Sequence, residues 1–169
     1  SNVDGKPRVL NAQDVKAPLL WHLPEFKDKR VAVVNIQLTH PPQKVNGYLI
    51  SYLMNQSLRA TYPEILQQEL SKQGIRYGHD VSVFYKGETA NHYFGEIMRV
   101  AQYQLETAIE LAKKVDVLFV NLTIADRLSH FLWSQIENDT GNLSDIPYVL
   151  QGYQFLDRAL AQLEQLVKT

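Results

Sequence analysis

The sequence predicts an α/β fold in which a mainly parallel sheet is flanked by helices. Residues 31–34 and 117–120 are short, continuous apolar runs, and such runs are typical of buried parallel strands. Between them, residues 88–114 repeat apolar side chains three and four positions apart, which indicates a long helix. With 169 residues, 45% of them hydrophobic, we expect residues 1–169 to form a single domain.

The other elements follow from alternation, helical periodicity and the placement of proline and glycine. In the first half, the predicted elements are a short helix over 14–23, strands over 31–36 and 48–51, and a rigid loop at 38–42 between them. A further helix starts at 61–64, carries Ile65, Leu66 and Leu70 on one face, and ends at Gly74. In the second half the predicted elements are a strand over 80–85, a helix over 88–114, a strand over 115–122, a helix after 126, a loop at 138–142 and a helix over 146–167.

Composition excludes several classes of function. Seventeen basic and eighteen acidic residues give a net charge of −1, which argues against a nucleic-acid-binding surface. The absence of cysteine excludes disulfides and thiolate metal sites. The apolar runs are too short to span a bilayer, and no signal peptide is visible. We therefore expect no membrane segment and a cytoplasmic location.

Asp126 and His130 are the first candidate site, because they follow the strand over 115–122. Ligands gather at the carboxyl ends of strands in open α/β sheets. Residues four apart lie on the same side of a helix, so this carboxylate and imidazole could share one divalent cation. Their oxygen and nitrogen atoms suit zinc, manganese or iron. The alternative is that Asp126 is the N-cap of the helix and His130 is an ordinary histidine that is bonded to Asp126 or faces solvent.

Asn35, Thr39 and His40 are the second candidate site, at the end of the strand over 31–36 and in the segment that follows it. A hydroxyl beside an imidazole can act as a nucleophile and its base. The alternative is that two prolines at 41 and 42 make this segment a rigid loop, which would shape a substrate pocket.

Several segments together resemble one known family. They are Trp21, residues 29–35 (KRVAVVN), 38–42 (LTHPP), 45–47 (VNG), 60–63 (ATYP) and 126–133 (DRLSHFLW). In this order and spacing, over residues 17–160, the chain resembles the type I phosphodiesterase/nucleotide pyrophosphatase-like phosphohydrolases of the alkaline-phosphatase superfamily.

The resemblance implies a partial alkaline-phosphatase-like fold and a two-metal phosphoric-ester hydrolase that acts on a phosphate ester or nucleotide. Asp126 and His130 match one pair of its metal ligands, with zinc or manganese as the expected cofactor, and Asn35, Thr39 and His40 would line the substrate pocket. The family's nucleophile falls upstream of the matched region, so none of these residues is predicted to be catalytic. Its Asp-His pair falls downstream, and the chain contains no Asp-His dipeptide. We therefore expect an internal fragment that is inactive in isolation.

Two other functions stay open at this stage. The chain could be a non-catalytic α/β domain that binds a small ligand through the loop at 38–51, or a domain that docks a partner. An incomplete sheet also has apolar edges that favour self-association.

Overall fold

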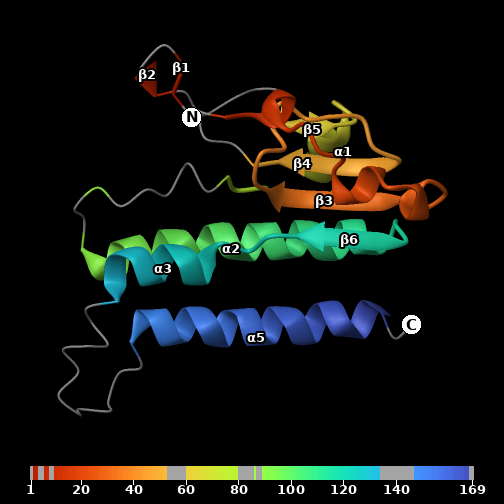
Figure 1. Cartoon of the computed structure of the whole chain (residues 1–169). Helices are drawn as coiled ribbons and strands as arrows, with labels where there is room; N and C mark the ends of the chain where they lie inside the picture. Colours follow the sequence, from red (N-terminus) through yellow and green to blue (C-terminus); the bar gives the residue numbers. More distant parts are fainter. Residues whose placement is uncertain are drawn as a thin grey trace.

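The computed structural model describes residues 2–3, 6–7, 10–52, 60–79, 86, 89–133 and 147–167 (Figure 1). Two short strands, β1 (Asn2–Val3) and β2 (Lys6–Pro7), pair with each other in an antiparallel ribbon. The remaining strands form a four-stranded sheet, and helices lie along one of its faces. The part of the chain that the structure describes is therefore an α/β fold, as the sequence predicts.

The sheet has the order β5-β4-β3-β6, so the central position belongs to β3 (Val31–Ile36). It pairs in parallel with β4 (Gly47–Ser51) and with β6 (Val117–Val120). The short β5 (Thr61–Tyr62) pairs with β4 in antiparallel fashion, which makes the sheet mixed. Residues 31–35 of β3 are all buried, as expected for an apolar strand with neighbours on both sides.

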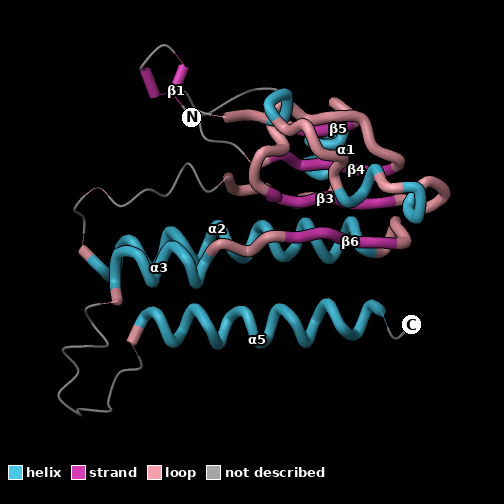
Figure 2. The backbone as a smooth tube through the Cα atoms, in the orientation of Figure 1, coloured by secondary structure: helices cyan, strands magenta, loops and turns pink. Residues whose placement is uncertain are grey.

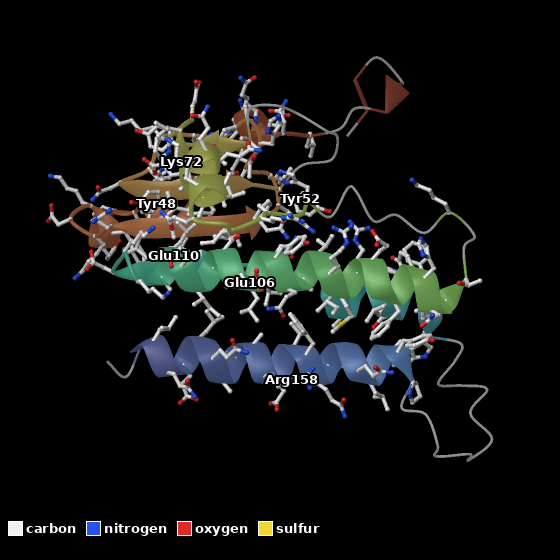
Figure 3. All side chains as sticks on the ribbon, turned by 180° about the vertical axis from the view of Figure 1, so that it is seen from behind. Tyr48, Tyr52, Lys72, Glu106, Glu110 and Arg158 are labelled. Carbon is white, nitrogen blue, oxygen red and sulfur yellow. The ribbon has the colours of Figure 1, made fainter. Side chains whose placement is uncertain are left out.

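Different elements cover the two faces of the sheet. On one face, Ala32, Val34 and Ile50 pack with Leu111 of α2 (Ala90–Ala112) and with α1 (Leu66–Lys72). Figure 3, seen from behind, shows α2 lying across this face. On the other face, the alternate residues of the same strands pack against Trp21 and Phe26, which lie on two short 3₁₀ helices (Figure 2).

A second apolar cluster joins α2 to α3 (Ile124–Leu132) and α5 (Tyr148–Val167). Helices α3 and α5 approach closely at Gly152, where a Cβ would lie 2.6 Å from Cδ1 of Leu128. Helix α5 runs beside α2 and beyond β6 rather than over the centre of the sheet (Figures 1 and 3). Within the described residues, no helix combines the length and apolar character that a bilayer crossing requires.

Most predicted elements are confirmed, with two differences in the first half of the chain. The helix predicted over 14–23 is replaced by separate 3₁₀ turns, at Ala12–Asp14 and Leu20–His22, because Pro18 and Pro24 break any longer helix. The first of these turns is capped by Asn11.

The second difference concerns residues 61–66. Thr61 and Tyr62 form β5, and helix α1 begins only at Leu66. Ile65, predicted to lie on one face with Leu66 and Leu70, is 50% exposed, whereas Leu66 and Leu70 are buried. Gly74, at φ +77, ends the helix as predicted. The strand predicted over 80–85 and the loop predicted at 138–142 lie outside the described residues.

Glycine is required at position 47, where the first residue of β4 contacts β3. Gly47 has φ +139, and a Cβ there would lie 2.1 Å from the carbonyl oxygen of Val31. We predict that Gly47→Ala lowers the free energy of unfolding by at least about 2 kcal/mol, because the clash is with backbone. Urea denaturation followed by circular dichroism measures this loss.

Gly95→Ala is the matched control, because Gly95 lies within α2 and a Cβ there meets nothing within 4 Å. This substitution should raise the free energy of unfolding by about 0.5–1 kcal/mol, since alanine loses less conformational entropy in a helix. Equal effects of the two substitutions would contradict the close packing of β3 against β4.

Candidate functional site

The carboxyl ends of the three parallel strands lie at the same edge of the sheet. Asn35 and Ile36 end β3, Ser51 ends β4, and Asn121 follows β6 directly. Helix α3 begins three residues later at Ile124 and carries Asp126 and His130. Both predicted groups of site residues are therefore positioned by the ends of neighbouring strands, where ligands of parallel sheets bind.

Asp126 and His130 stand side by side on the exposed surface of α3. Nε2 of His130 lies 3.4 Å from Oδ1 of Asp126, and the two side chains are 68% and 64% exposed. The N-cap of α3 is Thr123, so Asp126 is the third helical residue and not the cap. The alternative in which Asp126 serves as the N-cap is therefore wrong. In the first turn its charge still interacts favourably with the helix dipole.

The geometry of this pair fits two ligands of one cation. Two atoms that each lie about 2.1 Å from a tetrahedral ion are about 3.4 Å apart. The separation between Oδ1 of Asp126 and Nε2 of His130, which form an i,i+4 pair, has this value. Among the described residues, however, no cluster of three or more His, Cys, Asp or Glu side chains is found. The pair can thus contribute part of a coordination sphere.

Thr39 holds the loop after β3 against the end of β4. Its hydroxyl donates to the carbonyl oxygen of Ile36 at 2.6 Å and accepts from the backbone N–H of Tyr52 at 3.0 Å. The side chain is 1% exposed. Both hydrogen-bonding functions of the hydroxyl therefore stabilise the loop, and its contact with a substrate stays a prediction.

Asn35 connects the ends of β3 and β6. Its side-chain amide donates to the carbonyl oxygen of Asn121 at 3.0 Å, and the residue is 1% exposed. Its backbone has φ +59, a left-handed conformation that asparagine adopts more readily than most residues. Leu38 has φ +58, which is uncommon for leucine. The chain therefore turns sharply between β3 and the loop that carries Thr39.

His40 lies beside Ser51 rather than beside Thr39. Its Nδ1 is 3.3 Å from Oγ of Ser51, and the Ser51 hydroxyl donates to the carbonyl oxygen of Ala60 at 2.9 Å. Ser51 is fully buried, and its proton is already donated, so this pair is not arranged as a nucleophile and base. Burial lowers the pKa of His40, which favours the neutral imidazole.

Arg127 links helix α3 to this loop. Its guanidinium donates to the hydroxyl of Tyr52 at 3.0 Å, and the Tyr52 backbone in turn donates to Thr39. Figure 3 shows Tyr52 toward the opposite end of the sheet from Tyr48, which lies near the start of β4. Arg127, the residue after Asp126, is thus anchored to the loop at the strand ends, whereas Asp126 and His130 face solvent.

Sequence reasoning missed Ser51, Tyr52 and Asn121 as members of this site. Ser51 ends and Tyr52 follows the strand predicted over 48–51, and Asn121 lies near the end of the strand predicted over 115–122. This position is a usable signal, because the ends of parallel strands converge at one edge of the sheet. The pairing of His40 with Ser51 was not predictable, since it depends on the register between β3 and β4.

No protein-family profile, no curated protein sequence and no solved structure matches the chain.

We predict that Thr39→Val destabilises the strand-end loop. The backbone N–H of Tyr52 loses its acceptor, so the free energy of unfolding should fall by about 1–3 kcal/mol and the Tyr52 amide should exchange faster with solvent. Thr39→Ser keeps the hydroxyl and is the matched control. Amide hydrogen exchange by NMR measures both variants, and equal Tyr52 protection in the two would contradict the assigned role.

We also predict that His40 makes stability depend on pH. Its pKa is lowered in the folded state, so the unfolded chain, with an ordinary value of about 6.5, binds the proton first. The free energy of unfolding should therefore fall as the pH drops through about 6.5 and level off below the folded pKa. In His40→Asn, urea denaturation recorded at several pH values across this range should no longer show the fall in the free energy of unfolding that His40 causes. An unchanged pH profile would show that His40 is not responsible.

Proposed function

We propose that this chain carries part of a metal-dependent phosphoric-ester hydrolase, in which Asp126 and His130 supply two ligands of a divalent cation. The observation that carries the proposal is the 3.4 Å separation of Oδ1 and Nε2 on the exposed side of α3. A carboxylate and an imidazole at this separation suit zinc or manganese. When bound, such a cation stabilises negative charge that develops on phosphoryl oxygens.

The surroundings of the pair support this proposal. Helix α3 follows β6 directly, so the pair lies near the edge where the parallel strands end. The hydrogen bond from Arg127 to Tyr52 holds the first turn of α3 against the loop after β4. This anchoring fixes the helix that presents both ligands, which matters because ligand geometry must be maintained for the ion to be held.

The finer assignment is a phosphodiesterase or nucleotide pyrophosphatase of the alkaline-phosphatase superfamily, with a phosphate ester or nucleotide as substrate. The motive for this assignment is the resemblance of the short segments 126–133 and 38–42 to motifs of that family. Among the predicted substrate-binding residues, Asn35 and Thr39 are buried and would shape the rim of the pocket. His40 is only partly buried, and its neutral imidazole would be the group that contacts a polar substrate atom.

Isothermal titration calorimetry with Mn²⁺ and with Zn²⁺ tests the metal site without relying on activity. We expect weak, saturable binding to the unmodified chain, because Asp126 and His130 supply only part of a coordination sphere. Asp126→Asn and His130→Ala should each reduce the heat to that of a blank titration, since each removes one of the two ligands.

His92→Ala is the matched control, because His92 is another exposed histidine, located in the first turn of α2. This variant should bind the ions like the unmodified chain. Metal binding that survives both Asp126→Asn and His130→Ala, or that is lost equally in His92→Ala, would overturn the assignment.

A further inference from the structure

Strand β6 forms one edge of the sheet among the described residues, and none of its side chains is of a kind that discourages further pairing. Its four residues, Val117 to Val120, are all apolar and all only partly buried. The neighbouring β3 is almost wholly buried. Natural edge strands usually carry lysine, proline or a bulge that discourages further pairing, and β6 carries none of these.

The outer backbone groups of β6 are oriented for another strand. The backbone N–H of Val117 donates to the carbonyl oxygen of Arg30 at 3.2 Å, and that of Asn121 donates to the carbonyl oxygen of Val34 at 3.0 Å. The backbone groups of Val117 and Asn121 therefore face β3. In a parallel ladder, alternate residues direct their N–H and C=O groups to opposite sides. The backbone groups of Leu118 and Val120 therefore point away from β3, toward the outer edge.

A groove of about 760 Å³ runs along this edge, between β6 and the C-terminal part of α5. Its lining is mostly aliphatic and includes Leu118 and Val120 of β6 and Leu160 and Leu163 of α5. Leu160 on the α5 side is 67% exposed, which is the largest exposure among the large apolar side chains described. The groove thus combines unused strand hydrogen-bonding groups with an apolar wall.

The position of α5 indicates which kind of occupant fits. Helix α2 packs on the face of β3 and β6, and α5 lies next to α2, beyond the β6 edge (Figures 1 and 3). A second copy paired through its own β6 would be related by a two-fold axis and would bring its own α2 and α5 to this same face. Helix α5 already fills that space. An extended peptide segment brings no helix with it, so it can pair with β6 without colliding with α5.

The charges in the groove further define the occupant. Asp116 and Glu164 are the two charged residues in its lining, and both are acidic. They lie toward the end of the groove where β6 begins and α5 ends, and the C-terminus of a helix adds partial negative charge. A basic residue is therefore favoured at this end of the occupant.

We propose that β6 is a docking edge for an extended peptide segment that joins the sheet as an additional strand. The segment has apolar side chains at alternate positions, which pack against Leu160 and Leu163 of α5. At one end it carries a lysine or arginine that lies beside Asp116 and Glu164. Recognition by added strands obtains affinity from main-chain hydrogen bonds and specificity from the side-chain pockets.

A fluorescently labelled copy of residues 29–36 is a suitable probe, because the same sequence already pairs with β6 from the other side. It begins with Lys29 and Arg30, and parallel pairing puts these basic residues near Asp116. Fluorescence anisotropy should show saturable binding, and the amides of Leu118 and Val120 should become protected from hydrogen exchange. A peptide with N-methyl groups at alternate residues should not bind.

The variant Leu160→Lys should weaken binding by about tenfold or more, because it puts a cation into the apolar wall. Since Leu160 is exposed, the fold should be unaffected. The matched control is Leu150→Lys, an exposed leucine of α5 outside the groove, which should leave the affinity within about twofold.

Two results would overturn the proposal. One is the absence of saturable binding, or binding that Leu160→Lys does not change. The other is a dimer in sedimentation velocity, without peptide, that Leu160→Lys dissociates, because this would assign the edge to a second copy of the chain.

Discussion

The central strand β3 is paired with β4 on one side and β6 on the other, and polar side chains hold both ends of its contact with β6. At the start, the carboxylate of Asp116 accepts from the backbone N–H of Arg30 at 2.7 Å. At the end, the side-chain amide of Asn35 donates to the carbonyl oxygen of Asn121 at 3.0 Å. Because a shift of one residue would turn every side chain of a strand to the opposite face, these contacts help to fix which residues are buried.

This register between β3 and β6 has one consequence at the carboxyl end of β6 and another along its outer edge. Beyond its carboxyl end, the chain enters α3 at a fixed position, which sets where Asp126 and His130 emerge. Along its outer edge, the same register turns the backbone of Leu118 and Val120 outward. The proposed cation site and the proposed docking edge are therefore separate features of one strand and of the turn that follows it.

Much of the fold was predictable, because local patterns determine it. The apolar runs at 31–36 and 117–120 and the periodicity of α2 indicate strands and helix without tertiary information. The strand at 61–62 was not predictable, since two residues carry no pattern and their pairing with β4 depends on the fold. The edge position of β6 also escaped prediction, because a buried parallel strand and this edge strand share the same apolar sequence.

The site was predictable only where one helix determines it. Spacing alone indicated that Asp126 and His130 share a side of α3, and they do. Their neighbours depend on long-range contacts, such as the one between Arg127 and Tyr52, which are 75 residues apart. No local pattern indicates that the guanidinium of Arg127 donates to Tyr52 instead of to water. Nor does any local pattern indicate that His40 lies beside Ser51.

The central claim is that Asp126 and His130 hold one divalent cation between them. Anomalous diffraction from a crystal grown with Mn²⁺ tests this claim most directly, since it locates the ion without reference to any activity. We expect an anomalous peak about 2.0–2.2 Å from both Oδ1 of Asp126 and Nε2 of His130. A peak bound elsewhere, with none between these two side chains, would contradict the account.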